Sequence, residues 1–287
     1  MAQVSLIEDR IIERYSDMST KLRTAADFVA GNPIDIATRS LRSVAQSSGV
    51  SPATFSRLAR VLGFEDYEEM REAGRMTVGH RLVPFSERAQ ALQRGDQSAA
   101  QFLNRQSTAC IQNIQYLQQD FPTDRLQEAV DALFQAKRVL LIGVLGSAGI
   151  VDYFAYQAQY FAREWTVAGR RGVSIPASYA QMSASDAVIA LTKAPYSAQT
   201  VRALKLAGEN GFKTIVLTDS HSSPALEYAD YFFIVPTETA NFFSSYVATL
   251  TLIETMMSML IAKVGPEAEV RIKATEEQAV KLGEALA

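Results

Sequence analysis

The sequence feature that most constrains the fold is residues 40–64, SLRSVAQSSGVSPATFSRLARVLGF. Apolar residues at helical spacing predict two short helices here, with inward faces formed by Leu41, Val44 and Ala45 and by Phe55, Leu58 and Leu62. Gly49 suits a left-handed turn between them, and Ser51 followed by Pro52 suits the start of the second helix. This arrangement predicts a helix-turn-helix, whose second helix enters the major groove of DNA.

The predicted helix-turn-helix carries a local positive charge. Residues 36–63 contain four arginines and no Asp or Glu, a net of 4 − 0 = +4, in a chain whose net charge is −3. A basic patch on an acidic chain is typical of a DNA-binding face. The expected DNA-binding residues are Arg39, Arg42, Ser51, Thr54, Ser56, Arg57 and Arg60. The alternative is an ordinary helical hairpin whose arginines form a solvated surface.

Composition narrows the class of protein. A chain of 287 residues that is 48% apolar has the length for two domains with real cores. Its first residues show no signal-peptide pattern, and its most apolar window, residues 242–262, contains Glu254, so we expect no membrane span. The single Cys110 and two histidines offer neither a disulfide framework nor a metal cluster. We therefore expect a cytoplasmic protein without cofactor or metal.

The pattern changes after residue 138, where strands and helices alternate. Short apolar runs predict buried parallel strands at 139–142, 187–191, 214–217 and 231–235, separated by helical stretches at 148–161, 198–210 and 224–228. The expected fold is an all-α N-terminal domain followed by an α/β domain with a mostly parallel sheet flanked by helices. The expected boundaries are 1–78 for the helix-turn-helix domain, 79–121 for a helical linker and 122–287 for the α/β domain.

Three loops after the predicted strands form a candidate ligand site, because ligands bind beyond the carboxyl ends of parallel strands. In the first loop two glycines would let the backbone approach a ligand, and Ser147 at a helix start would favour an anion. The second loop adds a lysine and two hydroxyls, and the third spans 218–223. The expected effector-binding residues are Gly143, Gly146, Ser147, Thr192, Lys193 and Ser197. The alternative is three tight turns with capping hydroxyls.

The order of these parts resembles the RpiR family of bacterial transcriptional regulators, whose second half is a SIS (sugar isomerase) domain. The resemblance covers nearly the whole chain and rests on residues 40–64 and 139–235, including KTIVLTDS at 213–220 and SPALEYAD at 223–230. It implies a dimeric or tetrameric regulator of a sugar or related catabolic operon. Such a regulator binds a double-stranded DNA operator and is gated by a phosphorylated sugar.

The resemblance also assigns individual positions. Ser147 matches the first phosphate-binding serine of the family. The second motif usually runs Ser-x-Ser-Gly-x-Thr, and here Thr192 and Ser197 stand at its first and last positions. Ala194 and Pro195 replace the middle Ser and Gly, which leaves open a phosphorylated sugar, another anion or a non-phosphorylated metabolite as effector.

Two other classes of function stay open on the sequence. A sugar-phosphate isomerase needs a base beside a carbonyl carbon, and His221 and Glu238 are the residues that could supply it. We expect no enzyme, because a DNA-binding domain would be superfluous to a dedicated isomerase. A metabolite-binding module without regulation would leave the basic patch unexplained. Residues 242–262 predict a helix buried between subunits or against the sheet.

Overall fold

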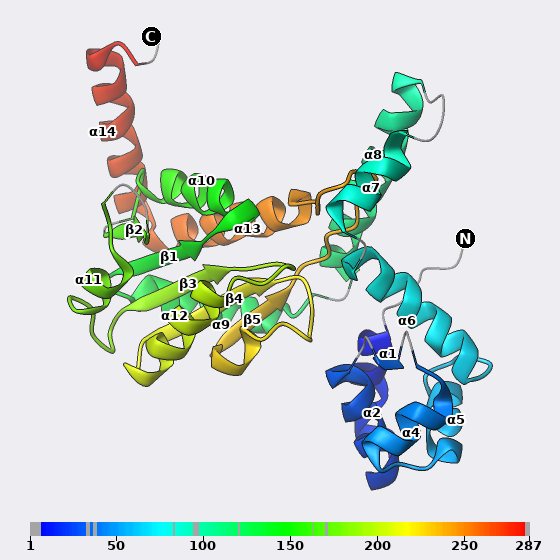
Figure 1. Ribbon diagram of the computed structural model, residues 1–287. Helices are drawn as coiled ribbons and strands as arrows, with labels where there is room; N and C mark the ends of the chain where they lie inside the picture. Colours follow the sequence, from blue (N-terminus) through cyan, green and yellow to red (C-terminus); the bar gives the residue numbers. More distant parts are fainter. Residues whose placement is uncertain are drawn as a thin grey trace. The chain divides into compact units, whose positions relative to one another are not determined.

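The computed structural model describes residues 7–32, 35, 36, 39–82, 84–93, 98–119, 121–162, 164–169 and 172–284. The chain forms two compact units, Met1–Arg94 and Gly95–Ala287. Figure 1 labels the helices and strands of both units. Each unit has its own apolar core.

The first unit is helical. Its elements are α1 (Ile7–Arg14), the 3-10 turn η1 (Tyr15–Asp17), α2 (Thr20–Gly31), α4 (Leu41–Ser48), α5 (Pro52–Val61), α6 (Tyr67–Leu82) and α7 (Phe85–Gln93). Phe55 of α5 is fully buried at the centre of the core, edge-on to Phe28 and Tyr67 at centroid distances of 6.1 and 6.4 Å. The predicted pair of short helices is therefore present and is held by the helices around it.

The second unit begins with two helices, α8 (Ala99–Gln119) and α9 (Thr123–Gln135), and continues as an α/β fold. Its strands are β1 (Val139–Gly143), β2 (Trp165–Val167), β3 (Ala187–Leu191), β4 (Lys213–Thr218) and β5 (Tyr231–Ile234). They form one parallel sheet in the order β2-β1-β3-β4-β5. Four strands match the predicted runs. β2 was missed because it has three residues and no apolar run.

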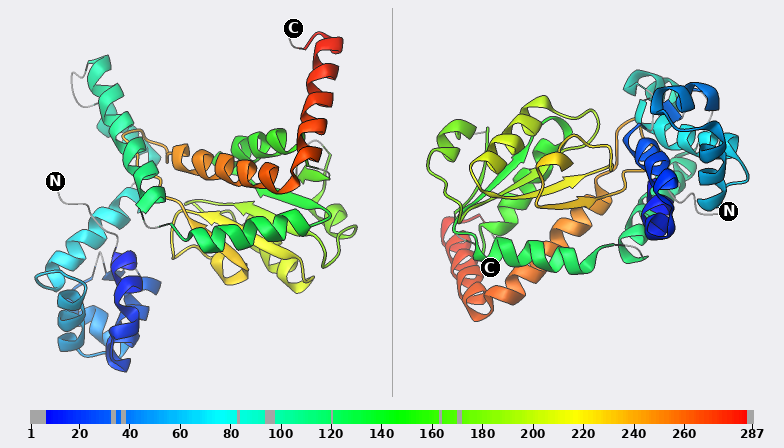
Figure 2. Two further views of the ribbon diagram at one scale, coloured as in Figure 1. Left: turned by 180° about the vertical axis from the view of Figure 1, so that it is seen from behind. Right: turned by 90° about the horizontal axis from the view of Figure 1, so that it is seen from below.

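Helices cover both faces of the sheet (Figure 2). Strand residues alternate between the faces: Leu141 and Ile189 pack with α9, α10 (Ala148–Ala158) and α13 (Val247–Val264). Leu140 and Val188 face the opposite core with α11 (Ile175–Tyr179) and α12 (Ala198–Glu209). Short 3-10 turns, η2 (Leu145–Ser147) and η3 (Leu226–Tyr228), follow β1 and precede β5. The last helix is α14 (Pro266–Leu282).

α13 is long and apolar enough to cross a membrane by length and composition, the one such helix among the described residues. Its most apolar side instead packs in the core of this unit. The residues on that side are Ala248, Leu252, Ile253, Met256, Met257 and Leu260, each at most 3% exposed. The sequence left open whether this helix is buried between subunits or against the sheet. In the structure these side chains pack against the sheet, in contact with β-strand residues.

Candidate nucleic-acid interface and effector site

The helix-turn-helix is built by local signals that the sequence carries. The Ser40 side chain accepts a hydrogen bond from Ser43 N at 3.4 Å at the start of α4, and Gly49 ends that helix at φ 70°. Ser51 Oγ accepts from Thr54 N at 3.3 Å at the start of α5, with Pro52 in its first turn. These caps satisfy backbone groups that a helix end leaves unpaired.

Arginines from α1 hold the other end of α5, a feature that sequence periodicity did not indicate. Arg10 Nη1 donates to Leu62 O at 3.0 Å, and Arg14 Nη1 donates to Val61 O at 2.8 Å. The Arg10 guanidinium also lies 4.3 Å from the centroid of the Phe64 ring. These cations satisfy the last carbonyls of α5 and complement the negative end of its dipole.

The residues expected to bind DNA lie at or near the surface of the helix-turn-helix. Arg42, Arg57 and Arg60 are exposed, as are Arg39 and Ser51, while Thr54 and Ser56 are half-buried. Arg39 forms an ion pair with Asp35 at 3.2 Å, just outside the acid-free stretch. The Ser51 and Thr54 hydroxyls lie 2.9 Å apart and bond to each other. The exposed positive charge of α5 thus comes from Arg57 and Arg60.

The loop after β1 is closed by another part of the chain. Residues 237–246, between β5 and α13, contact the loops that follow β1 and β3; we call these residues the strap. A Cβ on Gly146 would lie 2.5 Å from the Phe243 ring, and one on Gly143 would lie 2.6 Å from the Val151 side chain. The close approach that these two glycines permit is therefore made by the protein's own side chains.

Ser147 is buried beneath this strap, at 3% exposed. Its Oγ lies 3.1 Å from Tyr246 Oη, and the Tyr246 ring stacks on Phe243 with centroids 6.5 Å apart. Burial raises the pKa of Tyr246, and the hydrogen bond with Ser147 acts against that shift. Ser147 thus ends η2 next to a phenol that can donate or accept a proton.

Lys193, in the loop after β3, points into the protein beside the start of α13. Its Nζ donates to Thr249 Oγ1 at 2.6 Å and to Ser245 O at 3.3 Å, and lies 4.3 Å from the Tyr246 ring centroid. Burial lowers the pKa of Lys193 to about 7, with the Asp219 charge opposing the shift. The ammonium of Lys193 and the N-terminal end of α13 are both positive, so a bound anion would stabilise this arrangement.

The remaining loop residues pack tightly around Asp219. Its carboxylate accepts from Ala194 N at 3.2 Å and from Tyr196 Oη at 3.0 Å. Thr192 is 3% exposed, and Ser197 caps α12 by accepting from Thr200 N at 3.4 Å. The structure therefore brings Ser147 and Lys193 to one place, around Tyr246, while the Ser197 hydroxyl serves a helix end.

The two residues considered as an enzymatic base lie in different surroundings. The His221 ring packs edge-on to Phe232 with centroids 6.1 Å apart. Glu238 lies in the strap, where its backbone N–H and C=O both bond to Asn113 of α8, and its side chain is exposed. Among the described residues no group of His, Cys, Asp and Glu forms a candidate metal site.

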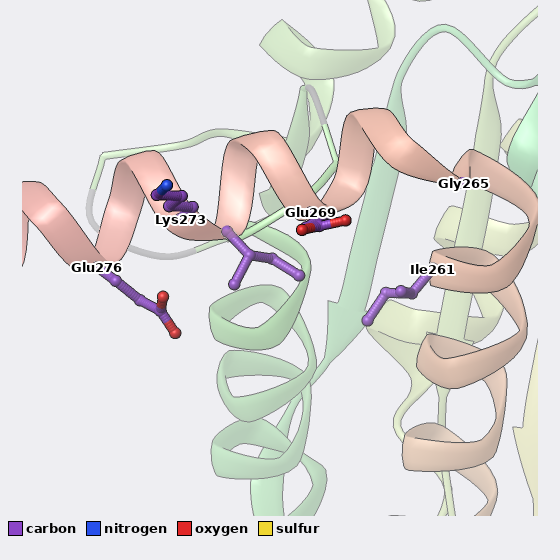
Figure 3. Close-up of a pocket in the computed structure, with 6 residues that line it drawn as sticks. Ile261, Gly265, Glu269, Lys273 and Glu276 are labelled. Atoms are coloured by element: carbon purple, nitrogen blue, oxygen red, sulfur yellow. The ribbon is translucent and has the colours of Figure 1, made fainter.

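A separate hollow of about 470 Å³ lies between α13 and α14 (Figure 3). Its lining residues are Ile261, Gly265, Glu269, Ile272, Lys273 and Glu276. Two glutamates against one lysine disfavour an anion, and the hollow is at the far end of α13 from Ser147 and Lys193. The loops after β1 and β3 are therefore the better candidate for the effector site.

Fold and motifs together define a helix-turn-helix protein with a separate α/β unit built on a parallel sheet. Residues 5–74 match the model of the helix-turn-helix domain of the rpiR family, and residues 132–259 match the model of the SIS domain. The chain belongs to the RpiR family of helix-turn-helix transcriptional regulators that carry a SIS domain.

Relatives agree with this membership. An uncharacterized HTH-type transcriptional regulator of Haemophilus influenzae is 25% identical over 235 residues, which is 80% of each chain. The HTH-type transcriptional regulator RpiR of Escherichia coli is 27% identical over 68% of this chain and 64% of its own length.

Solved structures share the fold. The sugar isomerase domain of an RpiR transcription factor from Sphaerobacter thermophilus matches 62% of this chain and 99% of its own, with a TM-score of 0.58 and 22% identity. The Vibrio vulnificus NanR protein, complexed with ManNAc-6P, matches 96% of this chain and 98% of its own, with a TM-score of 0.59 and 19% identity.

Proposed function

We propose that this protein regulates a sugar or related catabolic operon by binding its operator with α5 and responding to a small anionic metabolite. The observation that carries the DNA half is the exposure of Arg57 and Arg60 on a capped helix whose Phe55 and Leu58 are completely buried. A rigidly anchored helix with an exposed basic face suits the major groove. In this proposal Arg39, Arg42 and Arg60 hold phosphates, and Thr54, Ser56 and Arg57 reach bases.

The effector half of the proposal is a phosphorylated sugar bound at Ser147, Thr192, Lys193 and Ser197, with Gly143 and Gly146 shaping the first loop. It is supported by the buried side chain of Lys193, which bonds to Thr249 near the start of α13 and shares Tyr246 as a neighbour with Ser147. The ManNAc-6P complex of NanR supports the same class of ligand. A homodimer or homotetramer would present two reading helices to half-sites about 34–36 Å apart, or a multiple of that spacing.

The DNA half is tested by Arg57→Ala, with Lys21→Ala on α2 as a control that removes an exposed positive charge of the same unit. Binding is measured by fluorescence anisotropy on a duplex that the wild-type protein selects from a random pool. Arg57→Ala should cost about 1–3 kcal/mol if the contact is to a base. The control should retain wild-type affinity for the selected duplex. Equal affinity of Arg57→Ala and wild type would remove α5 from the DNA face.

The effector half is tested by a thermal-shift screen of the wild-type protein against sugar phosphates, among them ManNAc-6P, together with sugar acids and free sugars. A ligand that binds only the folded state raises the melting temperature by mass action. Ser147→Ala should lose the shift while keeping operator binding, and Ser258→Ala, on the exposed side of α13, should keep both. A normal response in Ser147→Ala would contradict the assigned site.

A further inference from the structure

The strap over Ser147 is held from its outer side by two polar residues of α8. Asn113 Nδ2 donates to Glu238 O at 2.7 Å, and Asn113 Oδ1 accepts from Glu238 N at 3.1 Å. One side chain thus satisfies both backbone groups of a single strap residue, as a neighbouring strand would. Asn113 is 2% exposed, the one buried residue among those of α8. A buried amide with both functions satisfied fixes its partner strongly.

Gln106 makes the second attachment, two helical turns earlier. Its Oε1 accepts from Ala240 N at 3.0 Å and from Thr239 Oγ1 at 3.1 Å. Its Nε2 is directed to Cys110, whose Sγ lies 3.8 Å from Ser245 Oγ. Gln106, Cys110 and Asn113 therefore lie along one side of α8 and meet the strap from residue 238 to residue 245.

The inner side of the same strap contacts the residues proposed to bind the effector. Phe243 covers Gly146, Tyr246 bonds to Ser147, and Ser245 O accepts from Lys193. The strap is closed on itself by Ser245 N, which donates to Thr237 O at 3.1 Å. Because its two ends are tied together, a displacement of Phe243 or Tyr246 by a ligand acts on the whole segment.

We propose that Gln106 and Asn113 are positioning residues that hold the strap over the effector site and transmit its displacement to α8. This proposal rests on the proposed function of that site. An anion at Ser147 needs the space and the hydrogen bond that Tyr246 and Phe243 now occupy. Its binding therefore moves the strap or recruits Tyr246 Oη as a donor. Either change reaches Gln106 and Asn113, on the helix that follows the DNA-binding unit in the chain.

The test is amide hydrogen exchange, read by mass spectrometry, on the full-length wild type, Gln106→Ala, Asn113→Ala and Gln112→Ala. Gln112 is exposed on the same helix and is the matched control. Without ligand, strap residues 237–246 should exchange roughly tenfold faster in the Gln106 and Asn113 variants, because local opening costs less. The control should exchange like wild type. Unchanged strap exchange in both variants, each shown by circular dichroism to be folded, would overturn the positioning role.

The transmission is tested with inorganic phosphate, the anion common to the phosphorylated candidates. In wild type and Gln112→Ala, phosphate should alter exchange in the Ser147 loop, in the strap and in α8. In the Gln106 and Asn113 variants the loop should respond and α8 should not. A full α8 response in those variants, or no α8 response in wild type, would overturn the transmission. If phosphate leaves the wild-type loop unaffected, the proposed effector site fails, while the ligand-free comparison still decides whether α8 positions the strap.

Discussion

Among the described residues, Lys193 is the one lysine or arginine that is buried. It is 6% exposed, and its partners are a hydroxyl, a carbonyl and an aromatic ring, with no carboxylate bonded to its Nζ among the described contacts. An ammonium in such a site loses hydration that neutral partners restore only in part. Its pKa is accordingly lowered to about 7.

The lowered pKa gives Lys193 a defined effect on stability. Between pH 7 and 10.5 the unfolded state binds a proton at Lys193 that the folded state lacks. Burial of the charged lysine therefore lowers the free energy of unfolding by its full amount below pH 7, and this destabilisation fades as the pH rises toward 10.5. Relative to Lys193→Met, the wild-type free energy of unfolding should rise by up to about 1.4 kcal/mol per pH unit between pH 7 and 9. Urea unfolding followed by Trp165 fluorescence measures it.

The control for this prediction is Lys205→Met, an exposed lysine on α12. The difference in free energy of unfolding between the wild type and Lys205→Met should not show this rise with pH. A difference between wild type and Lys193→Met that stays constant from pH 6.5 to 9 would contradict the buried-ammonium account.

At the scale of elements, the helix-turn-helix depends on one left-handed residue. Gly49 has φ 70°, and a Cβ added there would meet open space. The cost of a side chain at this position is therefore conformational and does not arise from a clash. Because the turn sets the orientation of α5 relative to α4, strain from a side chain at Gly49 would destabilise the whole helix-turn-helix.

Gly49→Ala should lower the stability of the first unit by about 1–2 kcal/mol, because an L-residue resists the left-handed region. Gly49→Asn should cost less, since Asn tolerates this conformation through its short polar side chain. Thermal unfolding followed by far-ultraviolet circular dichroism compares the two variants with wild type. Equal melting temperatures for all three proteins would mean that the turn is not strained by a side chain.

For the whole molecule, the separate cores of the two units predict two separable unfolding events. The first core surrounds Phe55, and the others sandwich the sheet of the second unit. The one tryptophan of the sequence, Trp165, lies in β2 and packs edge-on to Phe154 at 5.7 Å. Tryptophan fluorescence therefore reports on the second unit alone, whereas circular dichroism reports on both.

Phe55→Ala should destabilise the first unit by about 3–5 kcal/mol, since it leaves a cavity in a fully packed core. In urea, the loss of helical circular dichroism should begin at a lower concentration, while the Trp165 fluorescence midpoint stays at its wild-type value. Phe233→Ala, in the core of the second unit, should move the fluorescence midpoint instead. A common shift of both signals in Phe55→Ala would show that the chain unfolds as one cooperative unit.

The sequence by itself determined the elements whose signals are local. Caps at Ser40 and Ser51, the turn at Gly49 and the apolar runs of β1, β3, β4 and β5 act within a few residues, so periodicity and turn chemistry predict them. Only the tertiary structure decided what surrounds the candidate site. The Ser147–Tyr246 bond joins residues 99 positions apart, and Asn113 reaches Glu238 across 125. An asparagine on a helix or a phenylalanine in a loop carries no pattern that names such a partner, because side chains so distant in sequence meet only when the sheet and its helices have packed.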